Sequence, residues 1–271
     1  MSGLRRAQTS PEETQSPPLV AGSFIFLMLR AVFFDIDDTL FSTTTFAARA
    51  REQSVDAMIA MGVRADRDLM IRELREVVQE FSSNFEHHYD KLLSRLPLEA
   101  TIGLNLPLVV AAGVVAYHET KFRDLCAYDD VTEVLRILSE TDLVLGVISN
   151  GLTLKQMEKL IRLRVHRYVT PTAIFVSDQM GVAKPNPKLY RRAIDRVGIL
   201  AGEALHVGDH PVNDVDAAKR AGMRTVWNRR EGKHLKAIGA SEPDHVAFNF
   251  WDVLDIIRDD YGVRVAAEPL R

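Results

Sequence analysis

The chain has 271 residues, 46% of them hydrophobic and 26% charged, which is ordinary for a globular protein of one large or two moderate domains. Its formal net charge of −3 gives no basic surplus of the kind that nucleic-acid binding uses, so we expect no nucleic-acid partner. The single cysteine, Cys126, excludes an intrachain disulfide, which fits the reducing cytosol, and we therefore expect a cytoplasmic protein.

The first 27 residues are predicted to be a disordered extension. Residues 1–18 are polar and rich in Pro, Ser and Thr, a composition that cannot bury a core. Residues 19–28 are apolar, but Arg30 cuts this run short of the ~20 residues that a membrane span needs. We therefore expect no membrane association. Met28 would itself serve as a start residue, directly before a complete first strand.

From residue 29 onward, short apolar runs alternate with longer amphipathic stretches. The apolar runs are rich in Val, Ile, Leu and Phe and predict strands at residues 29–34, 143–148, 173–176, 205–207 and 225–227. The amphipathic stretches predict helices at residues 131–139, 153–163, 187–197 and 214–221. This alternation predicts an α/β fold with a Rossmann-like parallel sheet and helices on both faces, in which ligands bind beyond the carboxyl ends of the strands.

The stretch between residues 42 and 125 departs from this alternation, because it has helical periodicity and no convincing strand. Apolar residues at three- and four-residue spacing predict helices at residues 46–61, 66–81, 87–96 and 107–122. Asp66 is a predicted N-cap, and Gly62 a predicted stop for the preceding helix. We predict a helical cap at residues 42–125, inserted into a catalytic core made of residues 28–41 and 126–271.

The first predicted strand runs into an acidic sequence, FFDIDDTL at residues 33–40. The Asp35 carboxylate can attack phosphorus and form an acyl phosphate. Asp37, two residues later, can protonate the leaving oxygen and then activate water. A cation beside both acids would lower their repulsion and neutralise the phosphate. Taken alone, the sequence is equally compatible with a solvated acidic turn.

Two further motifs follow later strands. In LGVISNG, residues 145–151, the Ser149 hydroxyl and the N–H groups around Asn150 at the start of a helix can hold a phosphate oxygen, although alone they are better explained as a helix cap. In GVAKPNP, residues 181–187, Lys184 supplies a fixed positive charge for the phosphate and for the nucleophilic carboxylate. Alone, Lys184 is compatible with an ordinary exposed loop lysine.

The fourth motif is LHVGDHPVND at residues 205–214, again at a predicted strand end. Mg²⁺ prefers oxygen ligands, and Asp209 fits as a direct ligand. Asp214 fits either as a second ligand or as a partner for water and Lys184, and alone it would be a helix cap. Each motif is weak or moderate evidence, but the four in this order predict a Mg²⁺-dependent phosphatase.

In these motifs the sequence resembles the haloacid dehalogenase-like hydrolase superfamily, over nearly the whole chain from Met28. The resemblance implies an aspartyl-phosphate intermediate and Mg²⁺ bound by Asp35, the backbone carbonyl of Asp37, and Asp209. The helical insert resembles the cap of the phosphoglycolate phosphatase-like branch. Residues 35–44 resemble archaeal enzymes described as glyceraldehyde 3-phosphate phosphatases.

We therefore predict hydrolysis of a small phosphorylated metabolite, a sugar or triose phosphate, and leave the oligomeric state open. A 2-haloacid dehalogenase would leave Asp37 and the pair Asp209 and Asp214 unexplained. A phosphomutase would use the same phospho-aspartate and differ only in the acceptor of the phosphoryl group. A catalytically silent binding module would be favoured by loss of Asp35, Asp37 or Lys184, and all three are present.

Overall fold

We describe the protein from a computed structural model, in which residues 28–82, 85–230, 232 and 234–266 are described. The predicted extension at residues 1–27 lies outside the described residues. The strands are β1 (Ala31–Phe34), β2 (Val144–Ser149), β3 (Ile174–Val176), β4 (Ala204–Gly208), β5 (Arg224–Asn228) and β6 (His245–Ala247). They form one six-stranded sheet in the order β3-β2-β1-β4-β5-β6, and every pair of neighbours is parallel.

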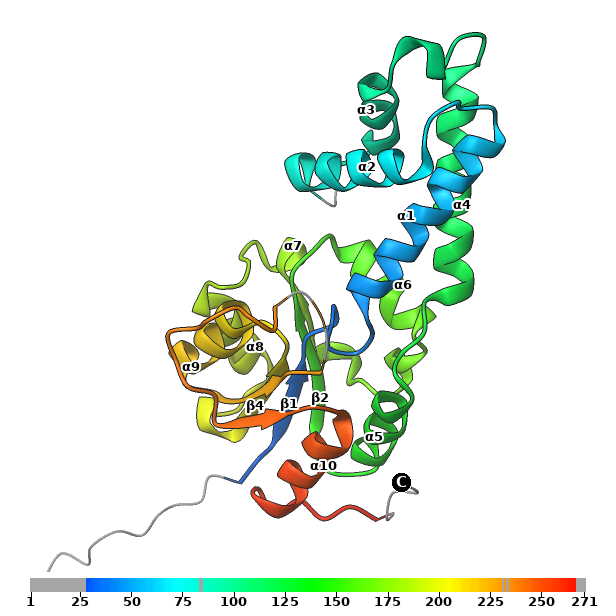
Figure 1. Ribbon diagram of the computed structural model, residues 1–271. Helices are drawn as coiled ribbons and strands as arrows, with labels where there is room; N and C mark the ends of the chain where they lie inside the picture. The colour runs from blue at the N-terminus through cyan, green and yellow to red at the C-terminus, as the bar shows by residue number, and fades with distance from the viewer. Residues whose placement is uncertain (1–27, 83–84, 231, 233, 267–271) are drawn as a thin grey trace, which may run out of the picture.

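Helices cover both faces of this sheet (Figure 1). On one face lie α5 (Asp129–Ser139), α6 (Thr153–Arg162) and α10 (Phe250–Asp259), and on the other lie α8 (Pro187–Val197) and α9 (Ala217–Ala221). The side chains of β1 alternate between the two hydrophobic clusters, because Phe34 packs into the first and Phe33 into the second. The predicted Rossmann-like α/β core is confirmed.

The order of the strands determines where ligands bind. From β1 the chain runs outward to β2 and β3, and then returns to β4 on the other side of β1. The carboxyl ends of β1, β2 and β4 therefore meet at the point where the direction of winding reverses, the usual ligand-binding position of such sheets. All predicted motifs except the Lys184 loop directly follow one of these three strands.

The structure differs from the predicted elements near the fourth motif. In place of one helix over residues 214–221, a π-helical turn, Pro211–Asp216, precedes the short α9. The His210 Nδ1 atom accepts hydrogen bonds from the backbone N–H groups of Val212 and Asn213, which sets the wide first turn. Among the α-helices and strands of the described residues, three more were not predicted: α7 (Ser177–Met180), β6 and α10.

Between β1 and α5 the chain forms α1 (Thr43–Ala60), α2 (Arg67–Phe81), α3 (His88–Arg95) and α4 (Leu106–Asp124). Helices α1 and α4 lie side by side as a stalk that rises from the core, and α2 and α3 lie at its far end (Figure 1). These helices share a hydrophobic cluster of their own. That residues 42–125 fold as a unit separate from the core stays a prediction.

Two local predictions for these helices hold. The Asp66 side chain caps α2 by accepting a hydrogen bond from the Leu69 N–H at 2.8 Å. Gly62, directly after the end of α1, has a φ of +104°, a conformation that strains any residue with a Cβ. Among the described helices, none combines the length and the apolar character that a membrane crossing requires.

Candidate active site

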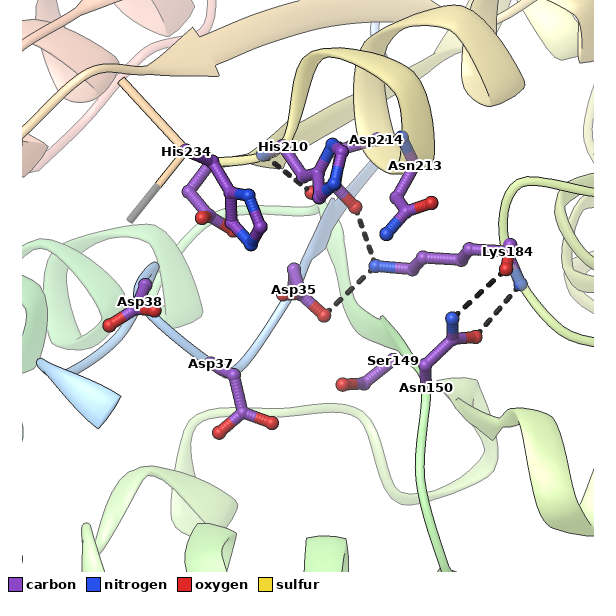
Figure 2. Close-up of a pocket in the computed structure, with 11 residues that line it drawn as sticks. Asp35, Asp37, Asp38, Ser149, Asn150, Lys184, His210, Asn213, Asp214 and His234 are labelled. Atoms are coloured by element: carbon purple, nitrogen blue, oxygen red, sulfur yellow. Dashed lines mark hydrogen bonds and ion pairs between the residues drawn. The ribbon is translucent and has the colours of Figure 1, made fainter. Parts of the chain in front are cut away.

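A pocket lies at the carboxyl ends of β1, β2 and β4 (Figure 2). The structure brings together all the site residues predicted from the sequence, since each lines this pocket: Asp35, Asp37, Ser149, Asn150, Lys184, Asp209 and Asp214. Asp38, His210, Asn213 and His234 complete the lining.

Lys184 lies between two buried carboxylates. Its Nζ atom is 2.9 Å from Oδ1 of Asp35 and 2.6 Å from Oδ1 of Asp214, and its side chain is only 3% exposed. Burial alone would lower the pKa of Lys184, but the charges of Asp214 and Asp35 outweigh it and raise the pKa. Lys184 is therefore a buried, fixed cation in the pocket and not an exposed loop lysine.

Asp214 is held by a network of buried donors. The backbone N–H of His210 donates to its Oδ2 at 3.0 Å, and Nε2 of His206 lies 3.1 Å from its Oδ1. The Tyr190 hydroxyl is within 3.4 Å of the same Oδ1 atom. Burial alone would raise the pKa of Asp214, but the charge of Lys184 and the hydrogen bond from His206 outweigh burial. The pKa of Asp214 is therefore well below its usual value, and the group is a carboxylate anion.

Gly208 ends β4 beside this network. A Cβ added at Gly208 would lie 2.3 Å from Cγ of Asp214, well inside any permitted contact. Only glycine therefore lets the Asp214 carboxylate lie over the end of the strand, next to Lys184. This close approach is a physical reason for the glycine in the fourth motif.

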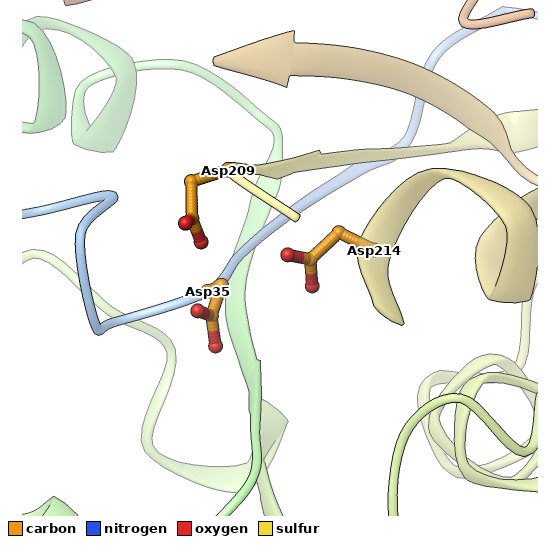
Figure 3. A group of neighbouring side chains, drawn as sticks. All are labelled: Asp35, Asp209 and Asp214. Atoms are coloured by element: carbon orange, nitrogen blue, oxygen red, sulfur yellow. The ribbon is translucent and has the colours of Figure 1, made fainter. Parts of the chain in front are cut away.

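One oxygen from each of Asp35, Asp209 and Asp214 lies within 4.8 Å of the others, and Figure 3 shows the carboxylates gathered around one space. Opposite ligands of a Mg²⁺ ion would be about 4.2 Å apart, so the spacing suits one such ion. Burial, together with the neighbouring carboxylates, raises the pKa of Asp35 to about 6 and that of Asp209 to about 9. Three buried carboxylates beside one lysine thus make a site suited to a further cation.

Asp37 has different partners. Its carboxylate points away from Lys184 in Figure 2 and forms an ion pair with Lys159 of α6, whose Nζ lies 2.6 and 2.7 Å from its two oxygens. The Thr43 hydroxyl donates to Oδ1 at 2.8 Å, and the Gln156 amide to Oδ2 at 3.1 Å. Burial alone would raise the pKa of Asp37. The charge of Lys159 and the hydrogen bonds outweigh burial, so the pKa of Asp37 is lowered.

The two residues predicted to bind phosphate differ in how they are held. Ser149 is buried at the end of β2, with its hydroxyl 3.4 Å from the Gln156 amide nitrogen. Both polar atoms of the Asn150 side chain instead contact the backbone of Lys184. Nδ2 donates to the carbonyl at 3.1 Å, and Oδ1 accepts from the N–H at 2.8 Å. The Asn150 side chain thus fixes the loop that carries Lys184.

Several residues of the site were not predicted. Lys159 and Gln156 lie on α6, ten and seven residues after Ser149, where the sequence shows only an amphipathic helix. His234 lies far from any motif, and its ring is tilted by 35° against that of His210, with centroids 4.0 Å apart. Trp227 donates from Nε1 to the Asp209 carbonyl at 2.9 Å. Asp38 in the first motif, and His206, His210 and Asn213 in the fourth, stood where the sequence could have pointed to them.

The comparison with known proteins agrees with this geometry. A model of the haloacid dehalogenase-like hydrolase family matches residues 29–222. A glyceraldehyde 3-phosphate phosphatase of Methanopyrus kandleri is 40% identical over 237 residues, which cover 86% of this chain and 98% of the relative. A protein of the same name from Pyrococcus abyssi is 41% identical over 200 residues, 74% of this chain and 81% of the relative.

Among solved structures, a HAD phosphatase from Thermococcus onnurineus has a TM-score of 0.61 at 22% identity, covering 84% of this chain and 98% of its own. A putative beta-phosphoglucomutase from Thermotoga maritima has a TM-score of 0.64 at 19% identity, with coverage of 85% and 99%. Structural likeness at this level of identity supports the fold alone. The family match and the sequence relatives go further: the chain belongs to the haloacid dehalogenase-like hydrolase family.

Proposed function

We propose that the protein is a Mg²⁺-dependent phosphatase that hydrolyses a small phosphorylated metabolite, with glyceraldehyde 3-phosphate as the first candidate substrate. The observation that carries the proposal is the buried Asp35–Lys184–Asp214 chain at the reversal point of the sheet, with Asp209 beside it. The substrate is suggested by the names of relatives that are 40% and 41% identical to this chain.

The chemistry follows from the two acids after β1. An oxygen of Asp35 attacks phosphorus, the ester P–O bond breaks, and the leaving alkoxide takes a proton from Asp37, which must be in its neutral, protonated form for this step. Water then attacks the phosphorus of the aspartyl phosphate and gives a proton to Asp37. Inorganic phosphate leaves and the Asp35 carboxylate is restored. Lys184 stays charged throughout and holds the phosphoryl oxygens beside Asp35.

The cluster fits a divalent cation by the chemistry and spacing of its oxygens. Asp35, Asp209 and the backbone carbonyl of Asp37 would hold Mg²⁺. Both oxygens of Asp214 already accept hydrogen bonds from Lys184, His206 and the His210 N–H, so its role is to support Lys184 and the cation. When bound, Mg²⁺ supplies positive charge that offsets the charge on the transferring phosphoryl group.

The test is a panel of phosphorylated metabolites, headed by glyceraldehyde 3-phosphate, with release of inorganic phosphate measured in Mg²⁺ and in EDTA. A 2-haloacid is included, with halide release as the readout. We expect phosphate release that requires Mg²⁺ and is absent from an Asp35→Asn variant. Halide release without phosphate release would support a dehalogenase, and transfer of phosphate between sugar positions would support a phosphomutase. Either result would overturn the proposal.

A further inference from the structure

Helix α6 contributes two side chains that hold Asp37, and the chemistry proposed above gives neither of them a part. Lys159 binds both Asp37 oxygens, at 2.6 and 2.7 Å, although the two residues are 122 positions apart. Gln156, almost one turn earlier, donates to Asp37 Oδ2 at 3.1 Å and to the Asn150 carbonyl at 2.5 Å. Asp37 therefore has donors from α6 on each oxygen.

Burial of the Gln156 amide lowers the stability of the fold. The side chain is buried, and its Oε1 atom has no hydrogen-bond partner among the described residues. An unpaired buried acceptor lowers stability, so a residue chosen for stability alone would avoid it. The Nε2 atom explains the amide, because its two hydrogens serve Asp37 and the Asn150 carbonyl, and it also lies 3.4 Å from the Ser149 hydroxyl. The side chain thus joins the strand ends of β1 and β2.

In the proposed reaction the Asp37 carboxyl group must lie close to the leaving oxygen, to which it gives a proton, and later close to the attacking water, from which it takes one. With Lys159, Gln156 and Thr43 bound, its oxygens accept from three side chains. A carboxylate with this many fixed partners keeps one orientation, and Figure 2 shows that orientation turned away from Lys184. The orientation of the Asp37 carboxylate therefore depends on Lys159 and Gln156 of α6.

We propose that Lys159 and Gln156 are positioning residues, which hold the Asp37 carboxylate for proton transfer to the leaving group. The proposal rests on the phosphatase function above. It concerns Asp37 and not the nucleophile or the buried lysine, because neither side chain contacts Asp35 or Lys184 in any hydrogen bond or ion pair found among the described residues.

The alternative is that Lys159 and Asp37 form only a stabilising ion pair between α6 and the loop after β1. The two explanations differ in their dependence on the leaving group. A nitrophenolate leaves without a proton, whereas an alkoxide needs one. Loss of a merely structural pair would affect both esters equally. Loss of a positioning residue would slow hydrolysis of the alkyl ester more. Because Lys159 lowers the pKa of Asp37, loss of its charge alone would favour the protonated acid and speed hydrolysis of the alkyl ester relative to the aryl ester, so only a fall in that ratio reports positioning.

The experiment compares kcat/KM for glyceraldehyde 3-phosphate and p-nitrophenyl phosphate in the full chain with Mg²⁺. This constant reports only steps up to release of the alcohol. In Lys159→Met, we expect the ratio of the two constants, alkyl over aryl, to fall about tenfold. Lys159→Arg should recover part of the ratio, and Gln156→Met should lower it in the same direction.

Lys155→Met is the matched control. Lys155 is an exposed lysine one turn before Lys159 on the same helix, and its substitution should leave the ratio unchanged. An unchanged or raised ratio in Lys159→Met would overturn the inference. Hydrolysis of neither ester by the native chain would instead refute the proposed function. A crystal structure of Lys159→Met then decides positioning by itself, because an Asp37 side chain in its original orientation would contradict it and a displaced one would support it.

Discussion

The three aspartates after β1 have the same side chain but different partners. Asp35 contacts Lys184, and Asp37 contacts Lys159. Asp38, with a φ of +54°, accepts hydrogen bonds from the N–H and hydroxyl of Thr44 and so fixes the first turn of α1. Because the chemistry of a carboxyl group depends on its surroundings, three chemically identical residues are suited to different parts: Asp35 to the proposed nucleophile, Asp37 to the proposed proton-transfer group and Asp38 to a structural cap.

Asp35→Asn should abolish turnover without unfolding the protein. An amide does not readily form the acyl phosphate, so we expect kcat to fall at least about a thousandfold. Burial already raises the pKa of Asp35 to about 6, so removing its charge should not lower the thermal midpoint. Phosphate release and a melting curve are measured on the same sample. Retained activity in a well-folded variant would contradict the role of Asp35.

Gly208→Ala should disable the site through one methyl group. Its Cβ would lie 2.3 Å from Cγ of Asp214, so the carboxylate must move away from Lys184. We expect kcat/KM to fall at least about tenfold and stability to fall by about 1–3 kcal/mol. Gly198→Ala in the loop before β4 is the control, because its Cβ would meet nothing within 4 Å, although its φ of +73° adds some strain. Equal activity losses in the two variants would argue against the clash.

At the scale of elements, the strands were predictable and the contacts between them were not. The apolar runs of β1 to β5 are local signals, and each functional motif follows its strand directly or lies in the next loop. The Lys159–Asp37 ion pair joins residues 122 positions apart, and no local pattern points to it. The π-helical turn at Pro211–Asp216 was missed because it depends on the His210 ring, which acts as its cap. β6 was missed because its three residues, HVA, give a weak apolar signal, whereas the equally short β3 is apolar throughout.

Asp244 links three elements, and its contribution should depend on pH. Its carboxylate accepts from the N–H and hydroxyl of Thr225 on β5, each at 2.9 Å, and from Lys219 of α9 at 3.1 Å. Burial opposes ionisation, but the hydrogen bonds from Lys219 and Thr225 outweigh it and lower the pKa of Asp244. A lowered pKa in the folded state gives stability that is present above the unfolded pKa of about 3.9 and is lost at lower pH.

Asp244→Asn should therefore lower the free energy of unfolding by about 1 kcal/mol at neutral pH, and the difference should close as pH falls below about 4. Urea unfolding of the native chain and the variant at several pH values measures it. A difference that stayed constant with pH would show that packing, and not the charge of Asp244, joins these elements.

At the scale of the whole molecule, the helices of the predicted cap meet the rest of the chain beside the candidate active site. Lys121 of α4 forms an ion pair with Glu158 of α6 at 2.5 Å, next to the Lys159 that holds Asp37. Helix α1 begins with Thr43, which also donates to Asp37. The elements that support the cap thus also touch the proposed proton-transfer group. This connection was beyond prediction, because the cap residues show only helical periodicity in the sequence.

Metal binding should be visible in the stability of the whole chain. An ion that binds only the folded state stabilises it by about 2.7 kcal/mol at one hundred times its Kd, which raises the thermal midpoint of a protein of this size by roughly 5 °C or more. We expect Mg²⁺ to do so, because three buried carboxylates face one space. EDTA should reverse both the shift and the activity, and Ca²⁺ should support little turnover, since its looser coordination disturbs in-line attack.

The Asp209→Asn variant distinguishes Mg²⁺ binding at the carboxylate cluster from weak Mg²⁺ binding elsewhere on the surface. The variant loses one proposed ligand but keeps the hydrogen bond from Trp227, which goes to the backbone carbonyl of residue 209. Burial and neighbouring charges raise the pKa of Asp209 to about 9, so a neutral amide should be tolerated when no ion is bound. We therefore expect a midpoint in EDTA close to that of the native chain, and the loss of most of the Mg²⁺-induced shift. A full shift in Asp209→Asn would place the bound ion outside the carboxylate cluster, and full activity of the native chain in EDTA would remove the metal from the mechanism.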